Sequence, residues 1–268
     1  MEGGKVVSLV YNGKEMLVSP IHPNYFRPVI DNDLSNTNFV PYTIPFHPYY
    51  EWQRATNSAK GQISNVHQNP DGSILVDSVW KVQCMKNVRT SVLVYPDGTL
   101  KLTSAGMPMM RLTRFGMQMA FHGSMEHVKW YGRGPQETYC DRKTGARIAL
   151  YTSTVTDLEH HYMRPQENGN RTDVRYVELT DAEGVGLRFT APLATPLQFS
   201  AWHYTQDELE KATHIHLLKH KNITTFNFDL AQLGVGGDMP GDAHVREPYI
   251  LHGKKPYSYS FTISPIVK

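Results

Sequence analysis

The clearest strand pattern in the sequence is the C-terminal stretch Tyr257-Ser258-Tyr259-Ser260-Phe261-Thr262-Ile263-Ser264. Large apolar side chains hold every second position, and hydroxyl side chains hold the positions between them. Successive side chains of a strand point to opposite faces of its sheet, so this alternation predicts a strand with one buried face and one wet face. The same period recurs over residues 225–230, and it is less clear around Leu75 and Val79 because Asp77 shares their face.

Three dipeptides typical of tight hairpin turns separate segments that are rich in Val, Leu, Tyr and Thr. They are Asn12-Gly13, Asp71-Gly72 and Asp97-Gly98. Asn or Asp followed by Gly favours the positive φ angles that hairpin turns need. The chain is therefore predicted to be all-β, with Gly4 to Tyr11 forming the body of the first hairpin.

Helical signals are rare. The stretch Thr205-Gln206-Asp207-Glu208 has the form of a capping box, which predicts the only helix, of about two turns. The stretch from Pro41 to Trp52 holds three prolines and five aromatic residues and is predicted to be an extended, exposed loop. Many short antiparallel strands in a chain of 268 residues predict two large sheets packed face to face. We expect a single domain over residues 1–268.

The charge balance excludes two classes of partner. The chain has 27 basic and 25 acidic residues, a net charge of +2 at pH 7. This charge is too small for electrostatic capture of a nucleic acid backbone or an anionic bilayer. No apolar run approaches the roughly 18 residues of a membrane-spanning helix. We therefore expect no nucleic acid and no membrane as a partner.

Two polar segments stand out as candidate binding regions. The first runs from Trp130 to Tyr139 and continues to Gly145; its Arg133 and Glu137 can either pair with each other or face a polyhydroxylated ligand. The second runs from Pro165 to Arg175 and holds Glu167, Asn168 and Arg171. Such groups match the vicinal hydroxyls of sugars, and a buried network joining two sheets would use the same residue types. Both interpretations stay open at this stage.

These segments also carry a resemblance to a known family. Together with Phe26-Arg27, Asp31-Asn32-Asp33, Gly234-Val235-Gly236-Gly237-Asp238 and the C-terminal strand, the chain resembles the C-terminal (small-chain) domain of family 2 glycoside hydrolase β-galactosidases. The resemblance runs from about residue 5 to the end, in order. It implies a supersandwich of two large antiparallel sheets similar to galactose mutarotase, which agrees with the strand pattern.

The resemblance implies an accessory function. In the family, the catalytic glutamates of a retaining mechanism lie on a TIM barrel that this chain does not contain, so no residue here is expected to be catalytic, Glu137 and Glu167 included. The domain closes one side of the active-site pocket and is expected to be inactive alone. No cofactor is expected in this chain, although the barrel is a candidate Mg or Na binder. The implied partners are a β-galactoside or related sugar, the TIM barrel and sandwich domains of the same enzyme, and further copies in a homo-oligomer.

The candidate substrate-binding residues come from the resemblance and from the polar segments. They are Arg27, Asp31, Asn32, Asp33, Arg133, Glu137, Glu167, Asn168, Arg171 and Asp238. The family carries a tryptophan three residues after the last aspartate, where this chain has Gly241. The missing aromatic face removes a stacking contact with the sugar, so hydrolysis of aryl glucosides and fucosides should be tested beside galactosides.

Several alternatives remain at the level of sequence. The same sandwich could serve an autonomous aldose 1-epimerase, which needs a carboxylate and a histidine across the sugar ring, or a carbohydrate-binding module. His214 and His216 would share one face of a strand, but no third ligand follows at a convincing spacing, so no metal site is expected. The early start of the first hairpin suggests a piece excised from a longer bacterial enzyme. The compartment is left open between cytoplasm and periplasm.

Overall fold

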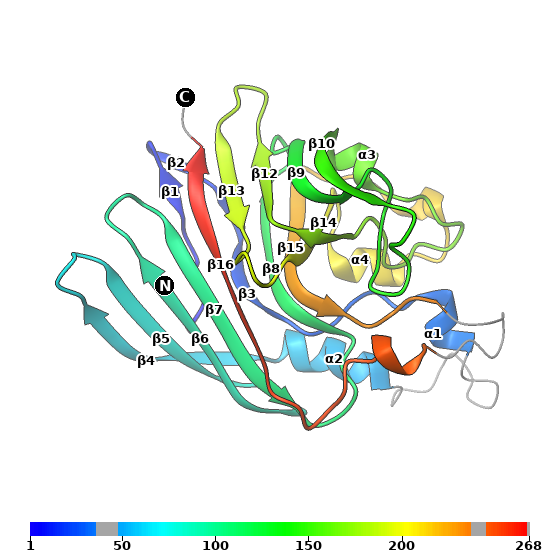
Figure 1. Cartoon of the computed structure of the whole chain (residues 1–268), viewed down its shortest axis with the longest axis horizontal. Helices are drawn as coiled ribbons and strands as arrows, with labels where there is room; N and C mark the ends of the chain where they lie inside the picture. The colour runs from blue at the N-terminus through cyan, green and yellow to red at the C-terminus, as the bar shows by residue number, and fades with distance from the viewer. Residues whose placement is uncertain (36–47, 237–244, 267–268) are drawn as a thin grey trace.

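Two antiparallel β-sheets packed face to face make up the computed structural model, which describes residues 1–35, 48–236 and 245–266 (Figure 1). The larger sheet has nine strands, in the spatial order β10 (Arg147–Thr154), β9 (His127–Gly134), β12 (Tyr176–Thr180), β13 (Gly186–Thr190), β16 (Tyr257–Ile266), β7 (Leu100–Pro108), β6 (Met85–Val94), β5 (Ile74–Lys81) and β4 (Lys60–Gln68). The smaller sheet has five, in the order β11 (Arg171–Val174), β14 (Leu197–Trp202), β15 (Ile223–Gln232), β8 (Arg114–His122) and β3 (Leu17–Asn24). The predicted all-β class with two large sheets is confirmed.

Short elements complete the described chain. The first hairpin consists of β1 (Val10–Tyr11) and β2 (Lys14–Glu15). The helices are α1 (Asp31–Ser35), α2 (Pro48–Asn57), α3 (Val155–Leu158) and α4 (Gln206–Lys211), with 3-10 turns η1 (Ile215–Leu217) and η2 (Glu247–Tyr249). No described helix is long and apolar enough to cross a membrane.

All three predicted hairpin turns are present. Gly13, Gly72 and Gly98 have φ angles of 77°, 83° and 83°, a region that glycine enters without a Cβ penalty. The turns join β1 to β2, β4 to β5 and β6 to β7. The first hairpin is shorter than predicted, because Val6 pairs with Ile21 instead of continuing its ladder.

The core lies between the two sheets and is built largely from aromatic side chains. Phe226 and Phe228 of β15 meet Phe189 of β13 at ring-centroid distances of 4.5 and 5.9 Å, and Phe228 meets Phe261 of β16 edge-on at 5.1 Å. The inward positions of the C-terminal strand, Tyr259, Phe261 and Ile263, are buried. The alternation predicted for this strand is therefore confirmed.

Strand β15 differs from its prediction. Its apolar side chains face the core, but Thr225, Asn227 and Asp229 on the opposite face are buried as well. Helix α4 covers this second face. Asn24 Nδ2 donates both to Gln206 Oε1 of α4, at 2.9 Å, and to Asn227 Oδ1 of β15, at 3.2 Å. A period of two shows that the two faces differ in polarity, and it does not show whether the polar face meets solvent.

The helix predictions are right at one place and wrong at three others. Thr205 and Glu208 form the predicted capping box of α4, with Glu208 N donating to Thr205 Oγ1 at 3.2 Å and Thr205 N donating to Glu208 Oε2 at 3.0 Å. Helices α1, α2 and α3 were not predicted, and α2 occupies part of the stretch predicted to be an exposed loop. Trp52 of α2 is fully buried and donates from Nε1 to the Arg111 carbonyl at 2.7 Å. Residues 41–47 of that stretch lie outside the described residues.

Candidate functional site

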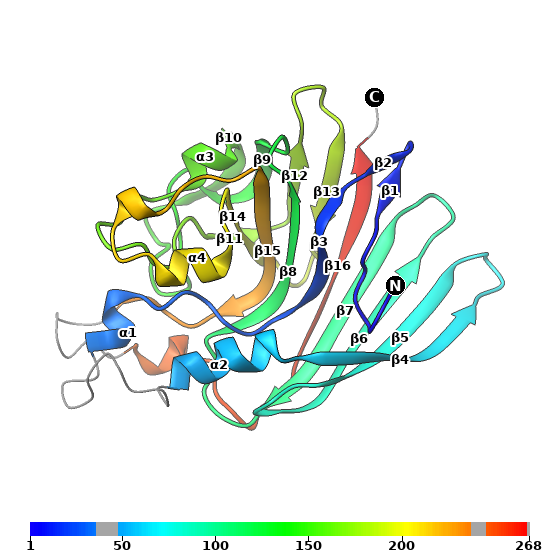
Figure 2. The same cartoon turned by 180° about the vertical axis from the view of Figure 1, so that it is seen from behind.

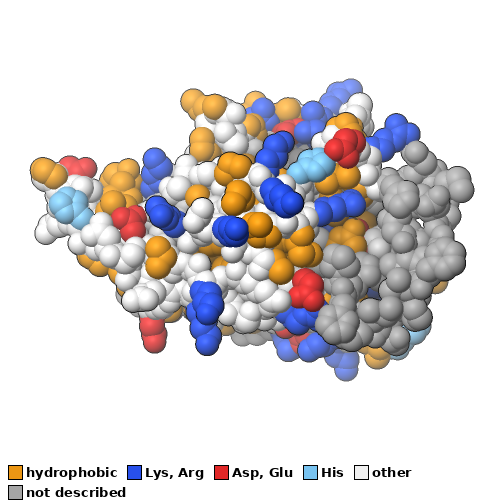
Figure 3. Space-filling view, turned by 90° about the horizontal axis from the view of Figure 1, so that it is seen from below, with side chains coloured by type: hydrophobic (Ala, Val, Ile, Leu, Met, Phe, Trp, Pro, Cys, Tyr) orange, Lys and Arg blue, Asp and Glu red, His pale blue; other side chains and the backbone are white. Residues whose placement is uncertain are grey.

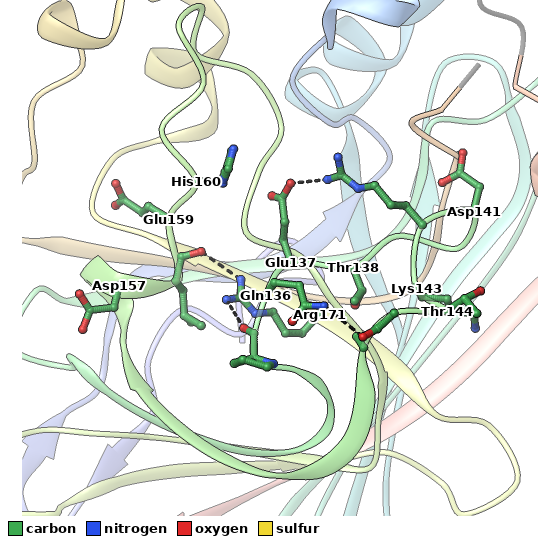
Figure 4. Close-up of a pocket in the computed structure, with 15 residues that line it drawn as sticks. Gln136, Glu137, Thr138, Asp141, Lys143, Thr144, Asp157, Glu159, His160 and Arg171 are labelled. Atoms are coloured by element: carbon green, nitrogen blue, oxygen red, sulfur yellow. Dashed lines mark hydrogen bonds and ion pairs between the residues drawn. The ribbon is translucent and has the colours of Figure 1, made fainter. Parts of the chain in front are cut away.

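Two adjoining pockets lie at the end of the sandwich where α1 and the long loops gather. The small pocket has a volume of about 210 Å³ and is lined by Ile30, Asp31, Asn32, Tyr139, Arg142, Tyr162, Gln166, Glu167 and Val235. The large pocket has a volume of about 750 Å³ and is lined by residues 135–138, 141–146 and 157–160 and by Arg171 (Figure 4). Arg142 lines both pockets.

Asp31 forms part of the rim of the small pocket. Its carboxylate is 64% exposed and accepts hydrogen bonds from Arg164 Nε at 2.6 Å and Gln166 Nε2 at 2.9 Å. Gln166 Oε1 in turn accepts from the Asp31 amide at 3.0 Å. The next residue, Asn32, donates from Nδ2 to the Val235 carbonyl at 2.7 Å. These contacts hold the start of α1 against two segments that are distant in sequence.

Arg27 and Asp33 lie behind the pocket and are fully buried. Arg27 Nη2 contacts the two Asp33 oxygens at 3.1 and 3.2 Å and donates to the Gly234 carbonyl at 3.1 Å. The same guanidinium also donates to the Leu233 carbonyl. Arg27 thus fixes the segment before α1 to the segment after β15. Of the predicted binding residues, these two position the pocket and do not line it.

Glu167 is a buried carboxylate at the base of the small pocket. Arg114 Nη2 donates to its Oε2 at 3.0 Å, and the Arg114 Nε lies 3.1 Å from Asp229 Oδ2. One guanidinium therefore forms ion pairs with two buried carboxyl groups. Burial raises the pKa of Glu167 and raises the pKa of Asp229 to about 7, although Arg114 acts against both shifts.

Glu137 lies between the two pockets. Its Oε1 accepts from the Arg142 guanidinium and the Tyr162 hydroxyl, and its Oε2 accepts from the Gly169 amide at 2.8 Å. Figure 4 shows the Glu137 carboxylate turned toward its arginine partner along the pocket wall. Every oxygen of this carboxylate is thus engaged within the chain.

Three further predicted residues support the backbone of these loops. Arg171 donates to the carbonyls of Leu158, Gly169 and Pro135 at 3.0, 2.7 and 2.8 Å, and burial lowers its pKa to about 10. Arg133 pairs with Asp173, and Asn168 Nδ2 donates to the Gln166 carbonyl at 3.0 Å. Arg133 and Asn168 line neither pocket, and Asp238 lies outside the described residues.

A sequence model of the family described as beta galactosidase small chain matches residues 1–263. The chain belongs to this family. It is 32% identical to a β-galactosidase of Halalkalibacterium halodurans over 98% of this chain and 26% of that protein. It is 31% identical to a β-galactosidase of Priestia megaterium over 98% of this chain and 25% of that protein. The chain thus spans about a quarter of the length of the curated relatives it matches.

The fold of this small-chain family member is also found in a solved structure of a galactose mutarotase related enzyme from Lactobacillus acidophilus. The match has a TM-score of 0.53 at 11% sequence identity and covers 98% of this chain and 91% of that chain. This likeness confirms the predicted mutarotase-like supersandwich and says nothing about activity.

Six residues that line the small pocket were not predicted from the sequence. They are Ile30, Tyr139, Arg142, Tyr162, Gln166 and Val235. Tyr139, Arg142 and Gln166 lie inside or next to the two polar segments already singled out, so the density of polar groups there was the available signal. Tyr162 carried no such signal, because only the fold brings it to the pocket.

No group of three His, Cys, Asp or Glu side chains among the described residues is arranged to hold a metal ion. The predicted strand face shared by His214 and His216 is wrong: His214 precedes the 3-10 turn η1, and His216 lies within it. Their ring centroids are 5.5 Å apart. The chemistry that the described pockets offer is therefore hydrogen bonding from carboxylate, amide and guanidinium groups.

Proposed function

We propose that this chain is the C-terminal domain of a longer, family 2 retaining β-galactosidase, and that its small pocket forms part of the wall of the sugar-binding site. Membership in the small-chain family and the roughly fourfold greater length of the curated relatives support the proposal. In this proposal residues 1–268 are one domain, and the full-length enzyme is a homo-oligomer.

The observation that carries the proposal is the assembly of the small pocket from four distant segments. Asp31, Arg142, Gln166 and Val235 come from separate parts of the chain and meet around one cavity. A carboxylate, a guanidinium and an amide at one rim offer the paired donors and acceptors that suit vicinal hydroxyls.

The catalytic carboxylates are assigned to the remainder of the enzyme. Retaining glycosidases use two carboxyl groups about 5 to 5.5 Å apart, one of them free to attack the sugar. Glu167 is buried against Arg114, and Glu137 is engaged by three donors. Neither carboxylate is available to attack the sugar. This chain therefore binds and orients the sugar, and the other part of the enzyme, with any Mg or Na ion it holds, cleaves the glycosidic bond.

The test is the variant Asp31→Asn in the full-length enzyme. Loss of the rim carboxylate should raise the KM for nitrophenyl galactoside about tenfold, which corresponds to about 1.4 kcal/mol of lost binding. The matched control is Asp157→Asn, which changes an exposed carboxylate that lines only the large pocket. A KM of Asp31→Asn equal to that of the parent enzyme contradicts the proposal.

A histidine and a carboxylate at the large pocket favour one second candidate, an aldose 1-epimerase. Such an enzyme would need a histidine and a carboxylate facing the same sugar, and His160 and Glu159 both line the large pocket. Polarimetry of freshly dissolved α-galactose separates the two functions. An epimerase accelerates the change in rotation, a sugar-binding module binds galactose without accelerating it, and a wall domain alone is predicted to do neither.

A further inference from the structure

The nine-stranded sheet carries an apolar face that the five-stranded sheet does not cover. One row of paired side chains crosses the sheet from its edge to the core and consists of Val66, Val76, Val92, Leu102 and Phe261. At the core end, Val92, Leu102 and Phe261 are 3%, 1% and 2% exposed, whereas Val66 at the edge is 62% exposed. The apolar row therefore continues beyond the part of the nine-stranded sheet that the five-stranded sheet covers.

A second apolar row lies on the same face, two residues further along each strand. Ile74 of β5 pairs with Val94, Val94 with Leu100, and Leu100 with Ile263. Ile263 is fully buried and Ile74 is 40% exposed. We call the uncovered part, made of Ile63, Val66, Ile74, Val76 and Val94, the overhang face.

The overhang face results from the different widths of the two sheets. Figures 1 and 2 show β4 and β5 extending well beyond β3, the last strand of the five-stranded sheet. At the end of the molecule that holds the β4–β5 hairpin, hydrophobic side chains reach the surface (left in Figure 3). The other face of the same strands is largely polar and includes the directly opposed pair Lys60 and Lys81.

The first residues of the chain lie on the same face. A Cβ at Gly61 would lie 2.4 Å from the Gly3 carbonyl oxygen, and a Cβ at Gly4 would lie 3.0 Å from the Trp80 ring. Gly61 and Trp80 are a register pair on β4 and β5, next along the strands to Ile63 and Ser78. Polypeptide joined to residue 1 would therefore leave the domain beside the overhang face.

We propose that the overhang face is the docking surface for the part of the full-length enzyme that lies outside this chain. This inference rests on the proposed function, in which the chain is one domain of an enzyme about four times as long. In that proposal, polypeptide joined to residue 1 leaves the domain at the Gly61–Trp80 end of β4 and β5. An apolar surface on the remaining part would extend both apolar rows beyond Val66 and Ile74. Burying exposed aliphatic side chains contributes about 25 cal/mol per Å² of apolar area.

The test is chemical labelling of single introduced thiols in the full-length enzyme. Val66→Cys probes the overhang face, and Val79→Cys is the matched control on the opposite face of the neighbouring strand. Val79 is 43% exposed against 62% for Val66, so the chain by itself predicts faster labelling at position 66. We expect a charged maleimide, followed by peptide mass spectrometry, to label Val66→Cys at least tenfold more slowly than Val79→Cys.

Labelling at position 66 as fast as at position 79 would overturn the proposal. Protection that disappears on dilution to a monomer would assign the face to a second copy and would overturn it as well. The readout is independent of turnover, so failure of the proposed sugar wall, seen as an unchanged KM for Asp31→Asn, is distinguishable from failure of docking. Val66→Asp should also lower the melting temperature of the full-length enzyme by about 2 °C or more, and Val79→Asp should not.

Discussion

At the scale of single residues, the ion cluster of Arg114, Glu167 and Asp229 controls how the site is held together. Removing one partner of a buried pair typically costs about 3–5 kcal/mol, because an uncompensated charge remains. Asp229 is the weaker partner: it lies 3.1 Å from Arg114 Nε, but neither atom is aligned for a hydrogen bond. This misalignment leaves burial as the dominant influence on the Asp229 carboxyl group.

The first prediction concerns the space that Asp229 occupies. A Cβ at Gly116 would lie 1.7 Å from Asp229 Oδ1, and a Cβ at Gly145 would meet nothing within 4 Å. Gly116→Ala must therefore displace a buried carboxylate, and we expect a loss of about 3 kcal/mol or more in the free energy of unfolding. Gly145→Ala should stay within about 0.5 kcal/mol of the parent. Urea unfolding measures both, and equal stabilities would show that the cluster tolerates displacement.

The second prediction concerns pH. The pKa of Asp229 is raised to about 7 by burial, whereas an unfolded Asp titrates near about 3.9. Between these values the unfolded chain has released the proton and the folded chain still holds it, so this group lowers the free energy of unfolding as pH rises. Asp229→Asn should remove this contribution and so flatten the slope between about pH 4 and pH 7 by up to about 1.4 kcal/mol per pH unit. An unchanged slope would mean that Asp229 titrates normally.

At the scale of elements, α4 matters because it covers the polar face of β15. Its side chain Gln206 accepts from Arg114 Nη1 at 3.0 Å and from Asn24 Nδ2 at 2.9 Å. The capping box at Thr205 fixes where this helix begins. The helix is only six residues long, so its terminus contributes a large share of its stability.

The third prediction follows from this cap. Thr205→Ala leaves the Glu208 amide without its side-chain acceptor, and we expect a loss of about 1 kcal/mol in the free energy of unfolding. Thr213→Ala changes an exposed threonine beyond the end of the helix and is the control. Urea unfolding of the two variants gives the comparison, and a cap variant as stable as the control would show that tertiary contacts alone hold α4.

Local patterns predicted the elements that depend on local forces, and they failed where tertiary packing decides. The glycine turns, the capping box and the alternation at Tyr259 and Phe261 were all predictable, because each is set within a few residues. Helix α2 escapes prediction because the three prolines between Pro41 and Trp52 are typical of a loop. Pro48 instead opens the helix, and proline is well tolerated in the first turn of a helix. The buried polar face of β15 could not be predicted, since it depends on a helix that begins at Gln206 and on an arginine at position 114.

At the scale of the whole molecule, the fold brings distant loops to one end of a sandwich and leaves one sheet wider than the other. The first feature assembles the small pocket from Asp31, Arg142, Gln166 and Val235. The second leaves Val66 and Ile74 exposed at the uncovered end of apolar rows that are buried toward the core. Both features are explained if this chain functions beside another part of the same enzyme.

In the proposed function, this chain shapes a sugar site whose catalytic carboxylates lie in the rest of a longer β-galactosidase. The most direct measurement is the hydrolysis of nitrophenyl galactoside by the purified chain, by the remainder of the enzyme, and by the two mixed. We expect no turnover by the chain alone and turnover when the two parts are combined. Turnover by the 268-residue chain alone would contradict it.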